Sequence, residues 1–268
     1  MSRLVVVSNR LADPRKPAAG GLAVALGDAL ARTGGLWFGS SGATAADLAP
    51  GEGRLRTRQA GKVLLASVDL CAEDHAAYYL GYANSVLWPV FHYRLDLADF
   101  DPAYLAGYRR VNQMFARKLL PLLRDDDLIW VHDYHLIPLA AELRALGCRQ
   151  RIGFFLQRLH AYGATVRVAA FPIGIDVEEF QALAAAPDAV GTFEALRAEY
   201  SRRQLLLGID RLDYSKGIPQ RVRAFRQLLE RYPENRNSAT LVMIASPSRD
   251  DVHAYADLRQ ELEGLCGA

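Results

Sequence analysis

Two cations flank a short loop in "GIDRLDYSKG", residues 208 to 217, where an apolar run ends. Arginine can bind two oxygens of a diphosphate as a planar fork and lysine supplies a point charge, so Arg211 and Lys216 are suited to hold a diphosphate. Asp213 lies between them and is a candidate to hold the arginine in place. Arg249, in "ASPSRDDV", offers a third cation after another apolar run. The alternative is a surface cluster of salt bridges.

The stretch "LIWVHDYHLIPLA", residues 128 to 140, places ionisable side chains directly after a second apolar run. Asp133 is suited to orient or deprotonate a hydroxyl, with a pKa set by its burial and its neighbours. It is also suited to cap the helix that follows, and His132 and His135 are also consistent with hydrogen-bonded core residues. Two histidines three residues apart, with no third ligand nearby, do not predict a metal site.

A third run ends in "SNRLADPRKPAAGGLAVAL", where Arg10 closes the run and a pair of glycines ending at Gly21 opens a helix. Glycines let the backbone approach a phosphate closely, and a helix N-terminus favours an anion. Taken alone, the stretch is equally consistent with a tight turn and a salt-bridged Arg10. It is not the GxGxxG fingerprint, and no ribose-binding acid follows about twenty residues later, which argues against a dehydrogenase.

Aromatic residues are dense in "YYLGYANSVLWPVFHY", residues 78 to 93. Aromatic faces stack on the C–H surfaces of sugar rings, while interspersed polar groups bind the hydroxyls. Core packing explains most of these side chains. We expect Tyr79 and Trp88 to be the two that face a ligand.

Predicted strands and helices alternate along the chain and would place these residues. Short apolar runs without alternation predict buried strands, and segments of helical period lie between them. This order predicts an α/β fold with parallel sheets, in which ligands bind at the carboxyl ends of strands. We expect two lobes, 1–156 and 157–268. The predicted strands are 3–7, 62–68, 128–132, 151–156, 166–171, 204–209 and 239–245, and the predicted helices are 21–32, 103–123, 136–146, 218–232 and 251–265.

Composition narrows the class of protein. The chain has 268 residues and a formal net charge of +2. This charge is too small to indicate a nucleic acid or an anionic membrane as a partner. The three cysteines are far apart and form no CxxC pair, which argues against a disulfide framework or a structural zinc site. The apolar run at the N-terminus is too short for a signal peptide, and no stretch is long enough to span a bilayer. We expect a cytoplasmic protein.

Several blocks together resemble the trehalose-6-phosphate synthases, the retaining glycosyltransferases of family 20. They occur in the family's order across almost the whole chain, and the longer ones are highly specific. The blocks are "VVVSNR", "GGLWFG", "YYLGYANSVLWPVFHYRLDL", "LLPLLRDDDLIWVHDYHLIPLA", "RIGFFL", "VAAFPIGID", "RLDYSKG" and "SPSRDDVHAY".

The resemblance implies a GT-B fold, with two Rossmann-like lobes and the reaction in the cleft between them. The first lobe would bind glucose 6-phosphate through Arg10, Tyr79, Trp88 and Asp133, with Arg249 near its phosphate or that of the donor. The second would bind UDP-glucose, whose diphosphate would be held by Gly21, Arg211 and Lys216. These cations would offset the charge that grows on departing UDP, so neither a metal nor a cofactor is implied. The acceptor hydroxyl would attack from the front face, without the carboxylate nucleophile of retaining glycosidases.

Three departures from the family set further expectations. A histidine-containing HIPFP segment and the elements after it are missing beyond Leu156, and the chain stops at Ala268, before the acidic motif that holds the nucleotide's ribose. We therefore expect both lobes to be incomplete, with exposed apolar surface that invites pairing with another chain. Ser40 replaces a tryptophan that contacts the acceptor, which leaves another acceptor open. The alternative to an enzyme is an inactive remnant that binds a sugar phosphate or forms an oligomer, with itself or with a full-length homologue.

Overall fold

The computed structural model describes residues 2–11, 21–156, 175–247 and 253–267. Contacts divide the chain into two compact units, Met1–Ile173 and Gly174–Ala268. The boundary predicted after Leu156 falls at the start of residues 157–174, which lie outside the described residues, as does the predicted strand 166–171. None of the helices in the described parts is long and apolar enough to cross a membrane.

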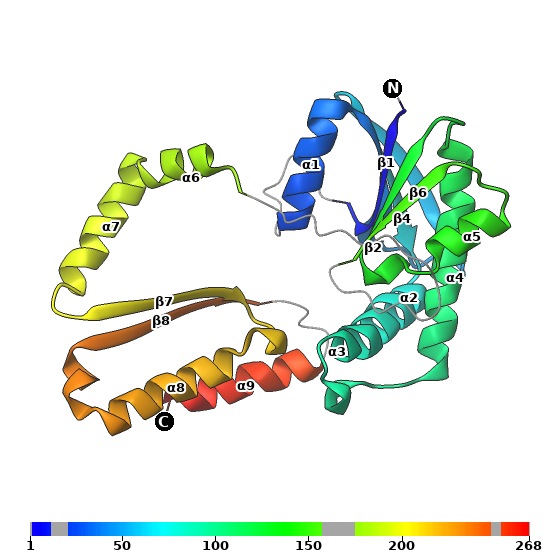
Figure 1. Ribbon diagram of the computed structural model, residues 1–268. Coiled ribbons are helices and arrows are strands. Elements are labelled where there is room, and N and C mark those ends of the chain that lie inside the picture. Colours follow the sequence, from blue (N-terminus) through cyan, green and yellow to red (C-terminus); the bar gives the residue numbers. More distant parts are fainter. Residues whose placement is uncertain (1, 12–20, 157–174, 248–252, 268) are drawn as a thin grey trace. The chain divides into compact units, whose positions relative to one another are not determined.

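The first unit is built around a six-stranded sheet of order β3-β4-β2-β1-β5-β6 (Figure 1). All its neighbouring strands are parallel except β3 and β4, which form an antiparallel pair at one edge. The strands are β1 (Leu4–Arg10), β2 (Gly35–Thr44), β3 (Arg54–Ala60), β4 (Val63–Leu70), β5 (Leu128–His132) and β6 (Arg151–Phe155).

Helices cover both faces of this sheet. Their bounds are α1 (Gly21–Thr33), α2 (Ala72–Asp74), η1 (His75–Leu87), α3 (Trp88–Phe91), η2 (Leu95–Leu97), α4 (Pro102–Leu119), η3 (Leu120–Leu122), η4 (Tyr134–Leu136) and α5 (Leu139–Ala145). Central β1 shows why both faces need cover, because three consecutive valines are fully buried and alternate between them. Val5 and Val7 pack into the larger core with α4 and α5, whereas Val6 packs into a smaller core with α1.

Strands β2 and β3 were not predicted. In β2, "GLWFGSSGAT", glycines and serines interrupt the apolar run although five successive residues, Leu36 to Ser40, are buried. In β3, "RLRTRQA", polar residues prevail because this edge strand is largely exposed. The aromatic segment forms the π-helix η1 and continues directly into α3, so residues 72–91 are helical throughout.

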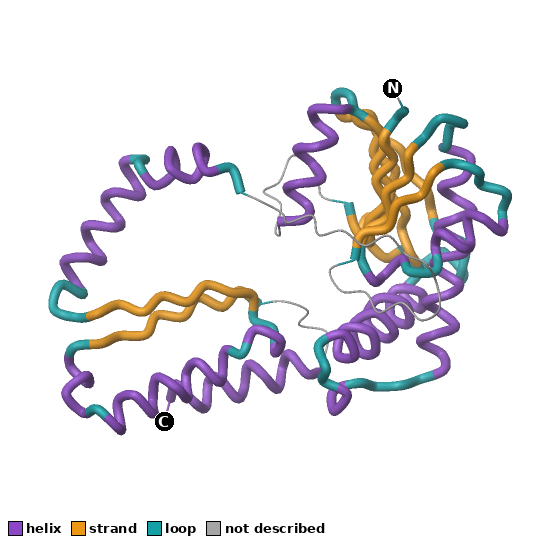
Figure 2. Tube along the Cα trace, viewed as in Figure 1, coloured by secondary structure: helices purple, strands orange, loops and turns teal. Residues whose placement is uncertain are grey.

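The second unit has a two-stranded parallel sheet of β7 (Gln204–Arg211) and β8 (Ala239–Ser246), drawn in orange in Figure 2. Its helices are α6 (Val177–Ala184), α7 (Pro187–Glu199), η5 (Tyr214–Lys216), α8 (Ile218–Arg231), η6 (Pro233–Asn237) and α9 (His253–Gly267). Helices α8 and α9 lie side by side, and Arg226 donates from Nη2 to the Leu265 carbonyl over 2.7 Å.

The expectation that these two runs are buried strands is wrong: both are strands, but no residue of β7 is buried, and in β8 only Ala239 is. Leu207 and Ile209 are 60% and 65% exposed, because the described part of this unit supplies neither further strands nor helices that cover them. The buried cluster lies instead at the carboxyl ends of the strands, where Leu212, Ile218 and Leu258 pack together. The core of this unit therefore sits beneath the loop that follows β7.

Candidate functional site

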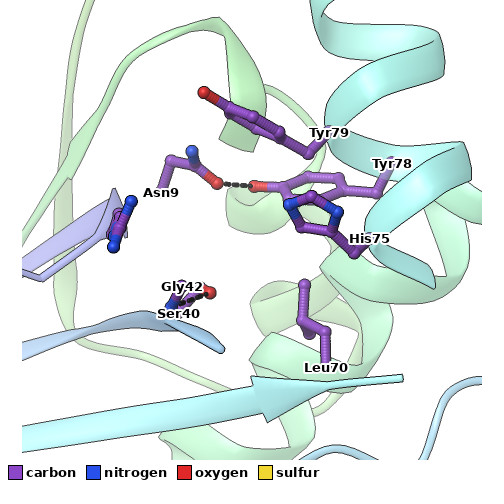
Figure 3. A pocket seen from close by; sticks show the side chains of 8 residues that line it. Asn9, Ser40, Gly42, Leu70, His75, Tyr78 and Tyr79 are labelled. Atoms are coloured by element: carbon purple, nitrogen blue, oxygen red, sulfur yellow. Dashed lines mark hydrogen bonds between the residues drawn. The ribbon is translucent and has the colours of Figure 1, made fainter. Parts of the chain in front are cut away.

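A small pocket lies at the carboxyl ends of β1, β2 and β4, where α2 gives way to η1 (Figure 3). Its volume is about 60 Å³. The pocket brings together two of the predicted site residues, Arg10 and Tyr79, with Ser40, which the sequence had marked as a departure from the family, and with residues that the sequence did not single out. The lining residues are Asn9, Arg10, Ser40, Gly42, Leu70, His75, Tyr78 and Tyr79.

Arg10 is exposed and its guanidinium lies against Gly42, so closely that a methyl group on Gly42 would overlap it. Gly42 has a φ of +79°, a conformation that favours glycine. The Ser40 hydroxyl accepts a hydrogen bond from the Gly42 N–H over 3.0 Å and so fixes this turn. Among the described residues Arg10 makes no ion pair, which leaves its charge available to an anion. The alternative, a salt bridge of Arg10 within a tight turn, is therefore not found among the described residues.

Tyr78 joins the helical wall of the pocket to the end of β1. Its hydroxyl donates to Asn9 Oδ1 over 2.9 Å, and its side chain is fully buried. Burial raises the pKa of Tyr78 well above its ordinary value, with smaller contributions from nearby groups that include Asp133. Tyr78 is therefore a neutral hydrogen-bond donor that fixes Asn9 next to Arg10.

A continuous row of rings leads from this pocket to Trp88. Successive centroid distances are 5.3 Å from His75 to Tyr79, 5.7 Å from Tyr79 to His135, 4.1 Å from His135 to Tyr134 and 5.5 Å from Tyr134 to Trp88. Tyr79 and His135 are nearly parallel, with 15° between their planes. Trp88 itself does not line the pocket, so the structure connects it to Arg10 and Tyr79 through rings rather than by direct juxtaposition.

Polar contacts from three elements fix the middle of this row. The Tyr108 hydroxyl, on α4, donates to the Tyr134 carbonyl over 2.6 Å, and the Tyr134 hydroxyl donates to Asn84 Oδ1 over 3.2 Å. Asn112 donates to the carbonyl of His135 over 3.2 Å. These contacts fix the orientation of the rings, most of which are largely buried. Aromatic rings held in this way suit the binding of a sugar at their exposed edges.

Asp133 has strained backbone geometry directly after β5. Its φ of +75° and ψ of 160° fall in a region that is almost restricted to glycine and costs about 1–3 kcal/mol. Its N–H donates to the Phe155 carbonyl over 2.9 Å, which ties it to the end of β6. The carboxylate caps η4 by accepting from the Tyr134 N–H over 2.8 Å, and it lies 3.6 Å from His135 Nδ1. The capping role is therefore real, and the partly exposed carboxylate also stands beside the row of rings.

His132 ends β5 beside Trp130 and Phe155 and is 1% exposed. Burial lowers its pKa to about 4, and the charge of Asp133 offsets this only in part. Neither ring nitrogen has a hydrogen-bond partner among the described residues. The interpretation of His132 as a core residue fits, but without the expected hydrogen bond.

In the second unit, Arg211 and Lys216 stand at the end of β7 and in the loop after it. Both are exposed, and neither side chain has an ion-pair partner within the described ranges. Gly217 follows in the left-handed conformation, with φ +63°, and lets the chain turn into α8. Within the described ranges these two residues therefore form no salt-bridge cluster.

Asp213 is fully buried and has partners of its own. Its carboxylate accepts from the Ser215 N–H over 2.9 Å and from the Tyr255 hydroxyl, on α9, over 3.0 Å. Arg221, on α8, lies 2.7 Å from Asp210 Oδ2 and donates to the Lys216 carbonyl over 2.7 Å. These contacts hold the loop on both sides. Asp213 was expected to hold Arg211 in place, and its contacts with Ser215 and Tyr255 attach it to the loop and to α9.

Two predicted residues cannot be placed in detail. Gly21 is the first residue of α1, after the segment 12–20, and Arg249 falls in residues 248–252; both segments lie outside the described residues. Within the described ranges, no group of three or more His, Cys, Asp or Glu side chains could hold a metal ion. The three cysteines are free thiols.

Sequence reasoning missed most of the supporting residues. Asn9 could have been found from its place beside Arg10 at a strand end, and His75 from its spacing of one helical turn before Tyr79. Tyr255 and Arg221 gave no signal, because their contacts with the loop depend on how α8 and α9 pack.

Comparison with known proteins places this chain in a family. The model of glycosyltransferase family 20 matches residues 6–159 and 156–268. The trehalose-6-phosphate synthases of Citrobacter koseri and Escherichia coli K12 are both 40% identical, over 323 and 324 aligned residues; each comparison covers 100% of this chain and 67% of the relative. The aligned span is longer than the chain, and the two family matches meet where a missing segment was expected.

Solved structures agree with the fold. An alpha,alpha-trehalose-phosphate synthase (UDP-forming) from Burkholderia xenovorans, in complex with glucose-6-phosphate, is 40% identical with a TM-score of 0.88, covering 99% of this chain and 70% of that one. Trehalose-6-phosphate synthase from E. coli bound with UDP-2-fluoro glucose is 39% identical with a TM-score of 0.86, covering 99% and 69%. The predicted GT-B type of α/β fold is confirmed, and the chain belongs to glycosyltransferase family 20.

Proposed function

We propose that this chain is a retaining glycosyltransferase that moves glucose from UDP-glucose to glucose 6-phosphate, giving trehalose 6-phosphate and UDP. The observation that carries the proposal is the pocket that joins Arg10 and Tyr79 at the carboxyl edge of the sheet. Support also comes from relatives that are named trehalose-6-phosphate synthases and from similar structures that hold glucose-6-phosphate or a UDP-glucose analogue.

In the first unit, the acceptor would bind along the row of rings. Arg10 would bind the phosphate as a bidentate fork, and Tyr79 and Trp88 would supply aromatic surface for the sugar. Asp133 would accept a hydrogen bond from a sugar hydroxyl, because its carboxylate is partly exposed and its backbone is fixed between β5 and β6. Arg249 is proposed as a further cation near a phosphate.

In the second unit, the donor's diphosphate would bind Arg211 and Lys216. Gly21 is proposed as a further donor-binding residue. As the bond from glucose to UDP breaks, negative charge grows on the diphosphate. The two cations, already in place and not neutralised by a described carboxylate, would stabilise that charge without reorganisation. Asp133, Arg211 and Lys216 are the proposed catalytic residues.

The bond changes follow from these positions. The acceptor hydroxyl oxygen would form a bond to C1 of the donor glucose on the face that UDP leaves, and the hydroxyl proton would pass to a donor phosphate oxygen. No covalent intermediate on a carboxylate is required. No cofactor takes part in the proposed reaction, and the free thiols favour the cytoplasm as its compartment.

A second candidate is a remnant of the family that binds sugar phosphate without turnover. The specific observation in its favour is the exposed apolar surface of β7. Such a protein would bind glucose 6-phosphate through the first unit alone.

Product analysis separates the two candidates. Incubation of the purified chain with UDP-glucose and glucose 6-phosphate, followed by NMR of the sugar fraction, is expected to show a disaccharide phosphate with α configuration at both anomeric carbons. A product with inverted configuration would contradict the proposed mechanism, and binding of glucose 6-phosphate without any disaccharide would support the remnant.

A further inference from the structure

His75 extends from the first turn of η1 into the acceptor pocket, where Figure 3 shows its imidazole beside the Tyr78 ring. The ring is half-buried and also packs against Tyr79. Tyr79 and Arg10, the two residues predicted to bind the acceptor, thus share one small pocket with an imidazole that none of the sequence motifs singled out.

The lining of this pocket contains no carboxylate among the described residues. Two acids lie next to it in sequence, and both are neutralised elsewhere. Asp74 lies 2.7 Å from Arg110 Nε and accepts from the Gly51 N–H over 2.7 Å. Asp69 accepts from Arg56 Nε over 3.0 Å and from the Ser41 hydroxyl over 2.7 Å.

A third acid, Asp133, lies 3.6 Å from His135 Nδ1 and is not among the residues that line the pocket, although its charge contributes to the raised pKa of the lining residue Tyr78. The lining groups that remain are a guanidinium, an imidazole, an amide and hydroxyls. Each of these groups has at least one hydrogen-bond donor, and the guanidinium and a protonated imidazole carry positive charge and only donate. Such a set suits a compact anion with several acceptor oxygens, which a phosphomonoester provides.

We propose that His75 binds the phosphate group of the acceptor together with Arg10 and thereby makes the site selective for a phosphorylated sugar. The inference rests on the proposed function for the identity of the acceptor. The imidazole N–H of His75, on η1, would donate to one phosphate oxygen, while the guanidinium of Arg10, at the end of β1, would donate to others. His75 is then a specificity-determining residue of the acceptor site.

The test compares His75→Leu, which removes both the charge and the donor, with His75→Gln, which keeps an N–H donor without a charge. Calorimetric titration with glucose 6-phosphate is expected to show roughly tenfold weaker binding for the leucine variant and a smaller loss for the glutamine variant. Titration with glucose, which lacks the phosphate, should give the same affinity in all three proteins.

Lys62→Gln is the matched control, because this exposed lysine precedes β4, at the opposite end of the strand from pocket residue Leu70. It removes one positive charge and should leave the affinity for glucose 6-phosphate unchanged. Circular dichroism of each variant checks that the helix is retained.

Two results would overturn the inference: unchanged binding of glucose 6-phosphate in the folded leucine variant, or an equal loss of affinity for glucose. Since binding is measured without turnover, a chain that binds glucose 6-phosphate in a His75-dependent way but forms no disaccharide would refute the proposed reaction and keep this inference. A chain that makes the disaccharide with a dispensable His75 would do the reverse.

Discussion

Arg10 depends on a neighbour that has no side chain. Its guanidinium lies on Gly42, whose turn is fixed by the Ser40 hydroxyl. A small residue, Ser40, thus supports the turn beneath the arginine, at a position where the resemblance to the family had led us to expect a tryptophan. The conformation of this turn therefore sets the position of Arg10, the residue proposed to bind the acceptor's phosphate.

Gly42→Ala is expected to weaken binding of glucose 6-phosphate roughly tenfold, because the new methyl group displaces the Arg10 guanidinium. The positive φ adds a loss of about 1–2 kcal/mol in the free energy of unfolding. Gly61→Ala is the control, because Gly61 also has a positive φ, +58°, but nothing within 4 Å of a new Cβ. Calorimetry and thermal melts check both; equal affinities in the two variants would contradict the role given to Gly42.

The pocket could be predicted in part from single residues. Arg10 was predicted from its place at the end of a strand and Tyr79 from the aromatic segment, and the two residues do line the same pocket. Leu70, Gly42 and His75 did not follow, since their role depends on three strands and a helix that converge there. Strained Asp133 could be located at a strand end, but its left-handed backbone is a property of the fold and has no signature in the residue type.

At the scale of elements, the loop between β7 and α8 presents the two cations. Arg221 links the strand end at Asp210 with the carbonyl of Lys216, while Asp213 is tied to Tyr255 on α9. The cations themselves have no described ion-pair partner, so the loop's shape comes from these neighbours.

Arg221→Ala is therefore expected to raise the KM for UDP-glucose roughly tenfold, with a smaller effect on the KM for glucose 6-phosphate, because Lys216 loses its support. Arg221→Lys should rescue only in part, since lysine lacks the fork that reaches both partners. Arg223→Ala is the control on the same helix, because Arg223 pairs with Glu261 instead. Equal kinetic effects of Arg221→Ala and Arg223→Ala would show that Arg221 does not position Lys216.

The end of β5 predicts an acid-sensitive fold. The pKa of His132 is about 4 when folded and about 6.5 when unfolded, so the unfolded state binds more protons between these values. The free energy of unfolding should fall as pH drops through this window, by about 2 kcal/mol between about pH 7 and about pH 5. Denaturant melts of wild type and His132→Phe check this; the same pH dependence in both would contradict it.

Element types were largely predictable, and pairing was not. The runs that became β1, β4 and β5 are mainly apolar because helices cover both faces, whereas small residues interrupt β2 and charged residues are frequent in β3. The π-helix that carries Tyr79 was not anticipated, since aromatic density has no helical period of its own.

At the scale of the whole molecule, the two units differ in how well their apolar surface is covered. The β1 valines are fully buried, whereas Leu207, Ile209 and Ile244 are at least half exposed. The departures from the family predicted exposed apolar surface in both lobes, but not this difference between them, because both sheets have similar apolar runs and burial depends on what packs around them.

We expect self-association through this surface. Sedimentation velocity should show a weight-average mass that rises with concentration, and the combined substitutions Leu207→Ser and Ile209→Ser should reduce it. Val24→Ser, at an exposed valine of the first unit, is the control. A monomer at all concentrations would contradict the expectation.

UDP release shows whether the chain transfers glucose with the help of Arg211. The purified chain and its Arg211→Ala variant would each be given UDP-glucose with and without glucose 6-phosphate. We expect the wild type to release UDP only when glucose 6-phosphate is present, and the rate to fall at least a hundredfold in the variant, because a group that stabilises the leaving diphosphate is lost. No release from the folded wild type, or equal release by both proteins, would contradict this expectation.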